Sequence, residues 1–505
     1  MDACHAEPPR HFLQGKTIFV AGGGIAGLAL VAGLRKLWDP ELAPPTVVIF
    51  ERDSCDPLRR RVAEYFTLSL TGHSEAGGLV ALQKLGLVDS VLGRAVAGRD
   101  DDEASGAFKI WGADWGERMR IRRTPLHGLP TANIRISRGD LRQVLLDAAM
   151  PQGDDAWQES HVRWESQCLD FEGLDDGRLR VRIRRRTSLP AVREGVTHHD
   201  DDDEGQECMS EQRVCDVLVA ADGANSKLRA FVRPWDTLEY AGAVLRGALS
   251  VFPAGGVPTP PGRDWGFVVS DSGVSCFVSP VNSRTVFWAL GNLEHDPVLE
   301  LRSGSNRDQA KQEADPAAVL ARSEELGAVF GSHFAALAAQ TELKTLFCTN
   351  ARDKRAFAHD ELLAGGSPVV FIGDGNHALS PFAGFGANLA LADGWDLAEQ
   401  LCRRAGDGDG SLAGAVAAYD AVSGPRAEKV LAASRRTVRA AHGMGWWAWF
   451  YWVVLVVGRC VAWAVGLIRH VASMVVCGWS GGGGDEAGAG LGLGAPAGAG
   501  SGRGT

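Results

Sequence analysis

The stretch KTIFVAGGGIAGLALVAGLRKLW, residues 16–38, decides the fold. An apolar run over 17–21 predicts a buried strand, a tight glycine turn follows it, and the remaining residues carry the apolar periodicity of a helix. The segment PTVVIFER, residues 45–52, predicts a second strand. A strand, a helix and a strand in this order predict a parallel sheet.

The glycines of this turn follow the pattern Gly22-x-Gly24-x-x-Gly27, which is typical of a dinucleotide-binding site. The first glycine makes the turn, the second lets backbone amides approach a pyrophosphate, and the third lets helix and strand pack closely. Glu51 ends the second strand, 24 residues after Gly27, where a carboxylate can accept both hydroxyls of an adenosine ribose. The alternative interpretation is a glycine-rich turn inside a core.

A second stretch, FIGDGNHALSPFAGFGANLALADG at 371–394, indicates which dinucleotide is bound. It places a lone carboxylate, Asp374, at a strand end that faces a glycine-rich helix start. A nicotinamide dehydrogenase needs no second corner of this kind, whereas FAD is long and must be held at both ends. Asp374 would accept hydrogen bonds from ribityl hydroxyls. The helix beginning near Gly384-x-Gly386 would direct its amides at the N1/O2 edge of the flavin.

These motifs resemble those of the single-component FAD-dependent aromatic hydroxylases, typified by para-hydroxybenzoate hydroxylase. The chain carries that family's three landmarks in order: the glycine pattern at 22–27, the D-G-x-x-S-x-x-R pattern at 222–229, and Gly-Asp with downstream Pro and G-x-G-x-N at 373–388. The segments at 65–87 and 380–391 are similar to the branch of tetracycline-inactivating monooxygenases and their fungal relatives. The resemblance extends over roughly 17–435. One departure is Gly375-Asn376-His377, where the family commonly has Ala-Ala-His.

The motifs and the resemblance together imply a set of FAD-binding residues. The D-G-x-x-S-x-x-R pattern is implicated in both FAD and NAD(P)H contact in the family. Either Arg138 or Arg142 matches the family's FAD-phosphate arginine. The predicted FAD-binding residues are Gly22, Gly24, Ala26, Gly27, Glu51, Arg52, Arg138, Arg142, Asp222, Arg229, Gly373, Asp374, Pro381, Gly384, Gly386, Ala387 and Asn388.

The resemblance also implies the reaction. In this family NAD(P)H reduces the flavin, which then reacts with dioxygen to give a flavin hydroperoxide. That species hydroxylates or epoxidises an electron-rich small molecule. The flavin carries the chemistry, so we expect no catalytic side chain and no metal, and the protein's task is to position the substrate and exclude water.

Three residues are candidates for substrate contact. Arg246 lies in a strand with apolar neighbours, where it either reaches a carboxylate or phenolate or occupies a surface strand position. His377 and Phe382 lie in the loop that should pass near the flavin ring.

Composition limits the other classes. A chain of 505 residues with a formal charge of -10 is long enough for a large core and lacks the basic surface of a nucleic-acid binder. Its ten cysteines show no C-x-x-C pair and no His/Cys ligand spacing, which suits a reducing compartment and not a zinc site. The N-terminus lacks the pattern of a secretion signal.

The predicted fold class is α/β: a Rossmann-like FAD-binding domain with a parallel sheet, interleaved with an antiparallel β-sheet substrate domain, and followed by a C-terminal hydrophobic helical segment. Short β-rich runs between 243 and 292 predict the antiparallel meander. The expected domains are a flexible N-terminus at 1–15, the FAD-binding domain at 16–240 with an acidic insertion at 185–212, the substrate domain at 241–345, the second FAD-binding part at 346–435, hydrophobic helices at 436–478 and a disordered Gly/Ala-rich tail at 479–505.

The segment at 446–468 is 23 residues long, which suffices to span a bilayer. Four tryptophans and a tyrosine crowd its N-terminal end, as at a membrane interface, and three arginines before it would keep the flavin domain on the cytoplasmic face. Arg459 in mid-span opposes insertion. The alternatives are a helix packed on the protein and a helix lying in the interface.

Other functions on the same fold are a flavin halogenase, a flavin reductase, or a membrane-tethered FAD-binding protein without catalysis. A halogenase would need W-x-W-x-I-P, whereas WGADWGERM at 111–119 has its tryptophans at another spacing and lacks Ile-Pro. The intact set of three motifs favours an FAD-dependent NAD(P)H monooxygenase acting on a lipophilic or aromatic small molecule, with dioxygen as the other substrate.

Overall fold

The computed structural model describes residues 11–56, 64–98, 106–151, 153, 155–186, 208–258, 260, 263–301, 313–403 and 410–442. The chain divides into two compact units, Met1–Gly445 and Trp446–Thr505, and every described residue belongs to the first. The predicted hydrophobic segment at 446–468 and the tail at 479–505 therefore lie outside the described residues. Within the described ranges, no helix combines the length and the apolar character that crossing a bilayer requires.

A five-stranded parallel sheet contains the predicted N-terminal strands, in the order β17-β11-β1-β2-β7. Val20 of β1 lies opposite Ile49 of β2 on one side and Val219 of β11 on the other. The parallel sheet predicted from residues 16–52 is confirmed. The strands are β1 (Thr17–Ala21), β2 (Thr46–Phe50), β7 (His161–Arg163), β11 (Val217–Ala220) and β17 (Val369–Phe371).

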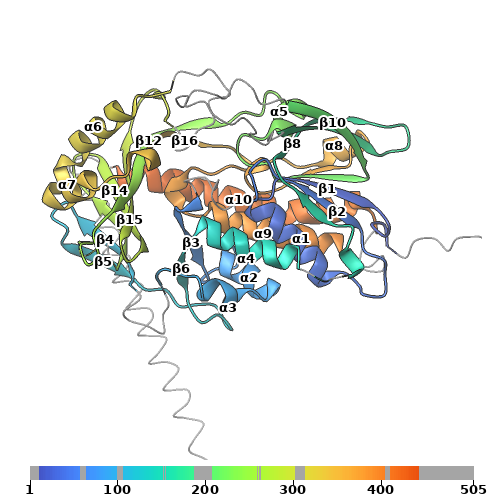
Figure 1. Ribbon diagram of the computed structural model, residues 1–505, viewed down its shortest axis with the longest axis horizontal. Helices are drawn as coiled ribbons and strands as arrows, with labels where there is room; N and C mark the ends of the chain where they lie inside the picture. The colour runs from blue at the N-terminus through green and yellow to red at the C-terminus, as the bar shows by residue number, and fades with distance from the viewer. Residues whose placement is uncertain are drawn as a thin grey trace, which may run out of the picture. The chain divides into compact units, whose positions relative to one another are not determined.

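The alternating side chains of these strands enter two separate cores. In Figure 1, β1 and β2 lie between helices that include α1 and α9 and the strands β8 and β10. Val20, Ile49 and Val219 pack against a layer of helices, whereas Phe19 and Phe50 pack against a small antiparallel sheet. The helical layer contains α1 (Ile25–Leu37), α2 (Gly78–Leu85), α3 (Val88–Leu92), α4 (Arg138–Ala149), α9 (Gly386–Leu401) and the start of α10 (Leu412–Ala441). The small sheet contains β8 (Ser166–Gly173), β9 (Leu179–Arg186) and β10 (Cys208–Cys215).

The acidic insertion that the sequence places at 185–212 begins and ends within this small sheet. Residues 185–186 belong to β9 and 208–212 to β10, and the two strands pair antiparallel along their whole length. The part between them, 187–207, lies outside the described residues. The insertion is thus placed between two strands of a hairpin.

A two-stranded antiparallel ribbon, β3 (Thr67–Thr71) with β6 (Asn133–Ser137), stands beside the helical layer. Leu70, Ile134 and Ile136 enter the helical core. Ser69 and Arg135, which are directly opposite each other, lie on the other face. The ribbon therefore presents a polar face away from that core.

A seven-stranded sheet, called here the large sheet, has the order β16-β12-β15-β14-β13-β4-β5. The four strands predicted at 243–292 are neighbours and antiparallel, but only β13, β14 and β15 form a meander in sequence order, because β12 pairs with β15 and not with β13. The sheet also recruits β4 and β5 from residues 108–121 and β16 from residues 347–353. The strands are β4 (Phe108–Gly112), β5 (Glu117–Ile121), β12 (Glu239–Val251), β13 (Trp265–Val269), β14 (Val274–Asn282), β15 (Thr285–Leu293) and β16 (Phe347–Asp353).

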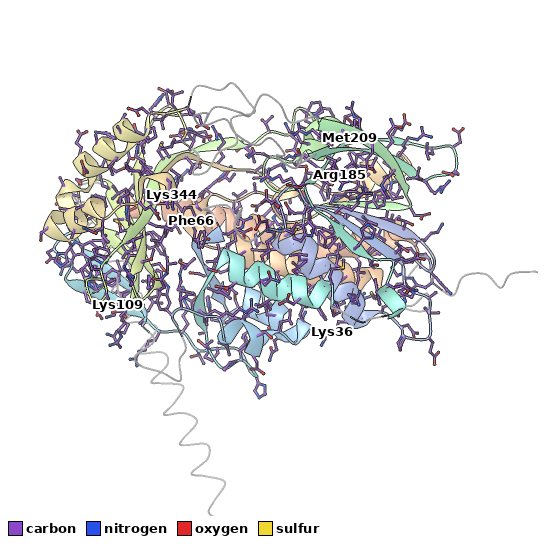
Figure 2. All side chains as sticks on the ribbon, in the orientation of Figure 1. Lys36, Phe66, Lys109, Arg185, Met209 and Lys344 are labelled. Carbon is purple, nitrogen blue, oxygen red and sulfur yellow. The ribbon has the colours of Figure 1, made fainter. Side chains whose placement is uncertain are left out.

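The two faces of the large sheet have different partners. One face carries a core that includes residues of α6 (Pro316–Gly327) and α7 (Gly331–Ala339). The other face carries a smaller cluster in which Phe287 and Phe347 contact Phe66, the residue before β3. Phe66 is labelled in Figure 2. We call this second face the aromatic face.

The remaining short elements connect these layers. They are η4 (Asp155–Trp157), α5 (Lys227–Val232), η5 (Ala328–Phe330), η6 (Leu343–Thr345), α8 (Asp360–Ala364), η7 (Gly373–Gly375) and η8 (Pro381–Ala383).

Candidate functional site

The predicted motifs converge because each follows a strand of the same parallel sheet. The glycine turn follows β1, and Glu51 follows β2. Asp222 is the second residue after the end of β11, and Gly373 is the second residue after the end of β17. Parallel strands place their carboxyl ends at one edge of a sheet, which is where ligands bind in open α/β folds.

The three glycines of the first turn have distinct surroundings. Gly22 has φ +111°, and a Cβ there would lie 2.4 Å from the Ala221 carbonyl oxygen. A Cβ at Gly27 would lie 2.2 Å from the Gly22 carbonyl oxygen. A Cβ at Gly24, by contrast, would meet no described heavy atom within 4 Å. Two glycines therefore permit close packing of the protein on itself, and the third leaves open space at the start of α1.

Glu51 is buried at this turn, with 7% of its surface exposed. Its carboxylate accepts hydrogen bonds from the Gly23 amide at 2.9 Å and the Asp53 amide at 2.8 Å. A carboxylate has about four acceptor sites, so these two bonds leave capacity for ligand hydroxyls. Arg52, the next predicted residue, is 53% exposed at its side chain and pairs weakly with Asp53.

The structure assigns different surroundings to the two alternative arginines of α4. Arg142 joins the glycine turn, because its Nε donates to the Gly23 carbonyl at 2.8 Å and its Nη1 to Glu64 at 2.7 Å. Its buried Nη2 lies 3.4 Å from Glu51 Oε2 and makes no hydrogen bond to the described residues. Arg138 lies nearer the other corner, where its charge acts on Asp374. Arg142 therefore belongs to the glycine turn, whereas the charge of Arg138 acts on Asp374 at the Gly-Asp corner.

The middle motif supports the Gly-Asp corner from behind. Ser226 caps α5 by accepting from the Arg229 amide at 2.9 Å, and Asp222 accepts from the Lys227 amide at 2.9 Å. The Arg229 guanidinium donates to the Gly375 carbonyl at 2.8 Å. Burial raises the pKa of Asp222, whose Oδ1 has no hydrogen-bond partner within the described ranges.

At the Gly-Asp corner, hydrogen bonds fix the backbone of Gly373 and Gly375, whereas the Asp374 carboxylate can still accept hydrogen bonds from a ligand. Gly373 has φ +58°, and its amide donates to Asp393 at 2.8 Å. No described group donates a hydrogen bond to the Asp374 carboxylate. Burial raises its pKa, and the charges of His377 and Arg138 oppose that rise. Asp374 is therefore an acceptor without a donor in a confined position.

The start of α9 resembles that of α1 in being open. Gly384 has φ +62° and ends the short helix η8, which contains Pro381, and Gly386 begins α9. A Cβ at either glycine would meet no described atom within 4 Å, and no side chain from the described residues caps the helix. The first amides of α9, including that of Ala387, are thus free of side-chain capping.

Asn388 has a supporting position. Its Oδ1 accepts from the Thr71 amide at 2.9 Å and the Gly78 amide at 2.7 Å, and its Nδ2 donates to the Ser69 carbonyl at 2.9 Å. This side chain therefore fixes the start of α9 to β3 and α2.

Ala26 lies where α1 packs against the Gly-Asp corner and against α9. The Ala26 Cβ lies 3.0 Å from the position that a Cβ on Gly373 would occupy. The Ala26 carbonyl oxygen lies 2.7 Å from the position that a Cβ on Gly394, in α9, would occupy. Small residues at these positions let α1 approach the Gly-Asp corner and α9.

The three candidates for substrate contact lie in different places. His377 is buried, with its Nε2 2.7 Å from Asp393 Oδ2. Burial alone would lower its pKa, but Asp393 outweighs burial and the pKa of His377 is raised. Phe382 is buried and lies 5.3 Å, edge to face, from His442 at the end of α10.

Arg246 is 5% exposed, so the surface-strand interpretation is wrong. It donates to Asn292 at 2.7 Å and pairs opposite Leu290 and Cys348, which belong to the core containing α6 and α7. Arg246 therefore lies on the face of the large sheet opposite to the aromatic face, and it does not share a face with the cluster that contains Phe66.

Sequence reasoning missed two features. One is the aromatic face itself, on which Phe267, Phe277 and Phe287 form edge-on and tilted pairs at 5.1 and 6.2 Å. The other is Arg135, which is 3% exposed on the polar face of the β3–β6 ribbon. The alternation of polar and apolar residues in TLSLT and NIRIS carries the signal for Arg135, since an arginine between two isoleucines in a strand must share a face with the polar residues.

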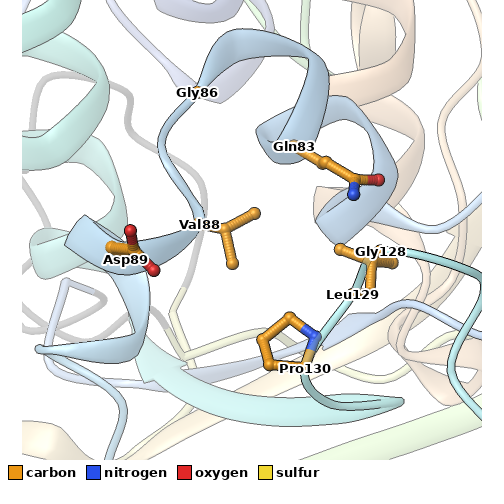
Figure 3. A pocket seen from close by; sticks show the side chains of 7 residues that line it. All are labelled: Gln83, Gly86, Val88, Asp89, Gly128, Leu129 and Pro130. Atoms are coloured by element: carbon orange, nitrogen blue, oxygen red, sulfur yellow. The ribbon is translucent and has the colours of Figure 1, made fainter.

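A separate groove of about 500 Å³ lies between α2, α3 and the loop at 128–130 (Figure 3). Gln83, Val88 and Pro130 are among its lining residues. None of the predicted FAD or substrate residues lines it, so it is distinct from the edge of the parallel sheet.

No family model matches the chain. Monooxygenase cfoF of Aspergillus candidus is 39% identical over 435 residues, which cover 86% of this chain and 93% of that protein. FAD-dependent monooxygenase fsr3 of Gibberella fujikuroi is 29% identical over 194 residues, covering 38% of this chain and 36% of that protein.

Two solved structures share the fold. Klebsiella pneumoniae HpxO complexed with FAD and uric acid has a TM-score of 0.58 at 18% identity, over 87% of this chain and 93% of HpxO. Tetracycline destructase Tet(55) has a TM-score of 0.57 at 14% identity, over 86% of this chain and 91% of that protein. At these identities the likeness concerns the mixed α/β fold with its parallel sheet.

Proposed function

Because the chain belongs to the family of FAD-dependent monooxygenases, we propose that FAD lies along the carboxyl edge of the parallel sheet, from Glu51 to the start of α9. The observation that carries this proposal is the pair of open helix starts. Gly24 and Gly386 each have free space where a side chain would stand, and Asp374 offers an unused carboxylate at the same edge. A ligand with a pyrophosphate at one end and a polyhydroxyl chain in its middle suits these groups.

Each end of this edge has a defined electrostatic task. The start of α1 carries a partial positive charge that stabilises a pyrophosphate, and Glu51 accepts the hydroxyls of the adenosine ribose. The buried Nη2 of Arg142 would gain a phosphate oxygen as a partner. Arg142 then acts at the adenosine half, and Arg138 acts near Asp374.

At the other end, Asp374 accepts hydroxyl donors from the ribityl chain. The uncapped start of α9 stabilises negative charge on the edge of the ring system when it is reduced. FAD, when bound, supplies the activation of dioxygen and the transfer of one oxygen atom. The protein's own groups hold and orient it, and Arg229 and Asp393 keep the Gly-Asp corner rigid through Gly375 and Gly373.

We propose that the substrate lies against the aromatic face of the large sheet. Phe267, Phe277 and Phe347 keep part of their surface exposed there, although Phe277 and Phe347 pack against the cluster around Phe287 and Phe267 contacts the Phe277 ring. Such a wall suits a lipophilic or aromatic molecule and excludes water from the reacting atoms. Of the three substrate candidates predicted from the sequence, Phe382 is the one that reaches the aromatic face, where its ring lies against Gly291. The aromatic ligands named for the structural relatives, uric acid and salicylate, agree with this class.

The test of the proposed function is oxygen transfer. The FAD-loaded protein is incubated with NADPH or NADH, a panel of aromatic and terpenoid compounds, and isotopically labelled dioxygen. Substrate-dependent NAD(P)H oxidation with one labelled oxygen atom in the product is expected. NAD(P)H oxidation that yields only hydrogen peroxide with every compound would favour the flavin reductase alternative.

We also propose that the segment at 446–468 attaches the enzyme to a membrane. The support comes from its sequence: 23 residues, with four tryptophans and a tyrosine at one end. Arg459 costs about 2.5 to 3.5 kcal/mol at mid-span, so a helix in the interface competes with a full span. The full-length protein should float with phosphatidylcholine vesicles in a density gradient, and recovery only at the bottom of the gradient would contradict attachment.

A further inference from the structure

Arg135 is a buried cation at the junction between the β3–β6 ribbon and the large sheet. The residue is 3% exposed and sits in mid-strand, opposite Ser69. Its Nε donates to Ser279 of β14 at 3.0 Å and its Nη1 to Ser69 at 2.7 Å. Its Nη2 donates to the carbonyl and the hydroxyl of Thr67. The guanidinium therefore joins the two sheets through neutral partners.

No carboxylate of the described residues lies within ion-pair distance of Arg135 or of the buried Arg229, whereas Arg142 and Arg426 each have two. Arg142 has Glu64 and Glu51, and Arg426 has Asp393 and Asp396. A buried charge without a counter-charge is destabilising, because hydroxyls and carbonyls replace only part of its hydration. Burial accordingly lowers the pKa of Arg135 to about 9. This energetic penalty is removed when an anion binds beside the guanidinium.

The guanidinium also keeps a donor for such an anion. It has five N–H groups, of which two are on Nη1. Nη1 makes a single hydrogen bond, to Ser69, among the contacts of the described residues. The second N–H of Nη1 is therefore available without breaking an existing bond.

The position of Arg135 connects it to the proposed reaction site. Its Cζ lies 5.1 Å from the centre of the Phe277 ring on the aromatic face. Ser69, its Nη1 partner, is also bound through its carbonyl to Asn388, in the first turn of α9. A small aromatic molecule on the aromatic face can thus direct an acidic group at Arg135 while its ring stacks near Phe277.

We propose that Arg135 is the anion-recognising group of the substrate site, and that the enzyme selects aromatic substrates bearing a carboxylate or an acidic hydroxyl. This inference rests on the proposed function, because it places the substrate on the aromatic face.

The test compares two probes of nearly the same shape, 2-naphthoate and 2-naphthamide, on the FAD-loaded enzyme. Their dissociation constants are measured from changes in the visible flavin spectrum, which needs no turnover. In the wild-type enzyme the anion should bind roughly 10- to 100-fold more tightly than the amide, the range for one charge-assisted hydrogen bond in a buried site. Arg135→Gln should reduce this ratio to about one while leaving the affinity for the amide nearly unchanged.

Two further variants separate recognition from folding. Arg135→Lys keeps the charge and should retain a preference for the anion, which a purely structural role in joining the sheets would not require. Arg246→Gln removes a buried arginine of the large sheet, on the face opposite to the aromatic face, and should leave the preference intact. Equal affinities for both probes in the wild-type enzyme, or a preference that survives Arg135→Gln and disappears in Arg246→Gln, would overturn the assignment. Failure to bind FAD at all would instead reject the proposed function.

Discussion

Alanine at Gly24 and alanine at Gly27 should have opposite consequences, although both changes add one methyl group to the same motif. At Gly24 the new Cβ meets no described atom within 4 Å, and the residue keeps an extended conformation with φ -82°. Replacing glycine at a helix N-cap by alanine costs about 1 kcal/mol or less. The apoprotein of Gly24→Ala should therefore unfold at nearly the same urea concentration as the wild type.

The loss for Gly24→Ala should occur in FAD binding. The methyl group stands where the pyrophosphate must approach the first amides of α1. Loss of two hydrogen bonds to charged oxygens, at about 1.5 kcal/mol each, amounts to about 3 kcal/mol. This corresponds to a dissociation constant for FAD raised roughly 100-fold. Titration of the apoprotein with FAD, followed by flavin fluorescence, measures it.

For Gly27→Ala the fold itself should suffer. Its Cβ would lie 2.2 Å from the Gly22 carbonyl oxygen, so α1 must move away from the turn. Overpacking of this kind costs about 3 kcal/mol, and the better helix propensity of alanine returns about 1 kcal/mol. A net loss of about 2 kcal/mol in urea unfolding is expected. Normal FAD affinity in Gly24→Ala, or wild-type stability in Gly27→Ala, would refute this reading of the motif.

Three further outcomes are expected. Asp374→Asn should weaken FAD binding by about tenfold, because it exchanges a charged acceptor for a neutral one, and apoprotein stability should not fall; unchanged affinity would remove Asp374 from the site. Asp393→Asn should lower the free energy of unfolding by about 3 kcal/mol, since it leaves the buried His377 without its counter-charge and leaves Arg426 with Asp396 alone. The pKa of His377 is raised in the folded protein, so its contribution to stability is fully present below pH 6.5, the ordinary pKa of histidine. The pKa of Asp393 is lowered, so its contribution is fully present above pH 3.8, the ordinary pKa of aspartate. Wild-type stability should therefore exceed that of Asp393→Asn most between these values and lose part of the advantage as pH rises through the raised pKa of His377; a constant difference up to pH 9 would contradict the pairing. Arg142→Met should reduce affinity for FAD more than affinity for riboflavin, because riboflavin lacks the phosphates, and equal losses would argue against a phosphate contact.

The parts of the site that could be predicted from the sequence are local in the chain. A strand, a glycine turn and a helix within 16–38 interact mainly with one another, so spacing alone indicated their geometry. Asp374 was recognisable for the same reason, as a carboxylate directly after a buried strand. The parallel pairing of β1 with β2 followed from the short strand-helix-strand connection between them.

What the sequence could not predict depends on contacts between distant segments. The period of a strand separates its residues into two faces but does not say which face meets the helices, and Arg246 turned out to lie on the reverse face of the large sheet. The pairing of β4 with β13, across more than 150 residues, has no local signal. The burial of His377 against Asp393 depends equally on the approach of α9 to the corner. Arg135 was visible only as a polar residue in a short strand.

The central claim is that this chain binds FAD and accepts electrons from a nicotinamide cofactor. The most direct test is the visible spectrum of the purified full-length protein, reconstituted with FAD, before and after NADPH is added without oxygen and with an aromatic substrate mixture present. Flavin absorption bands that remain with the protein through gel filtration and bleach on addition of NADPH are the predicted result. Protein that emerges without flavin, even after incubation with excess FAD, would contradict the account.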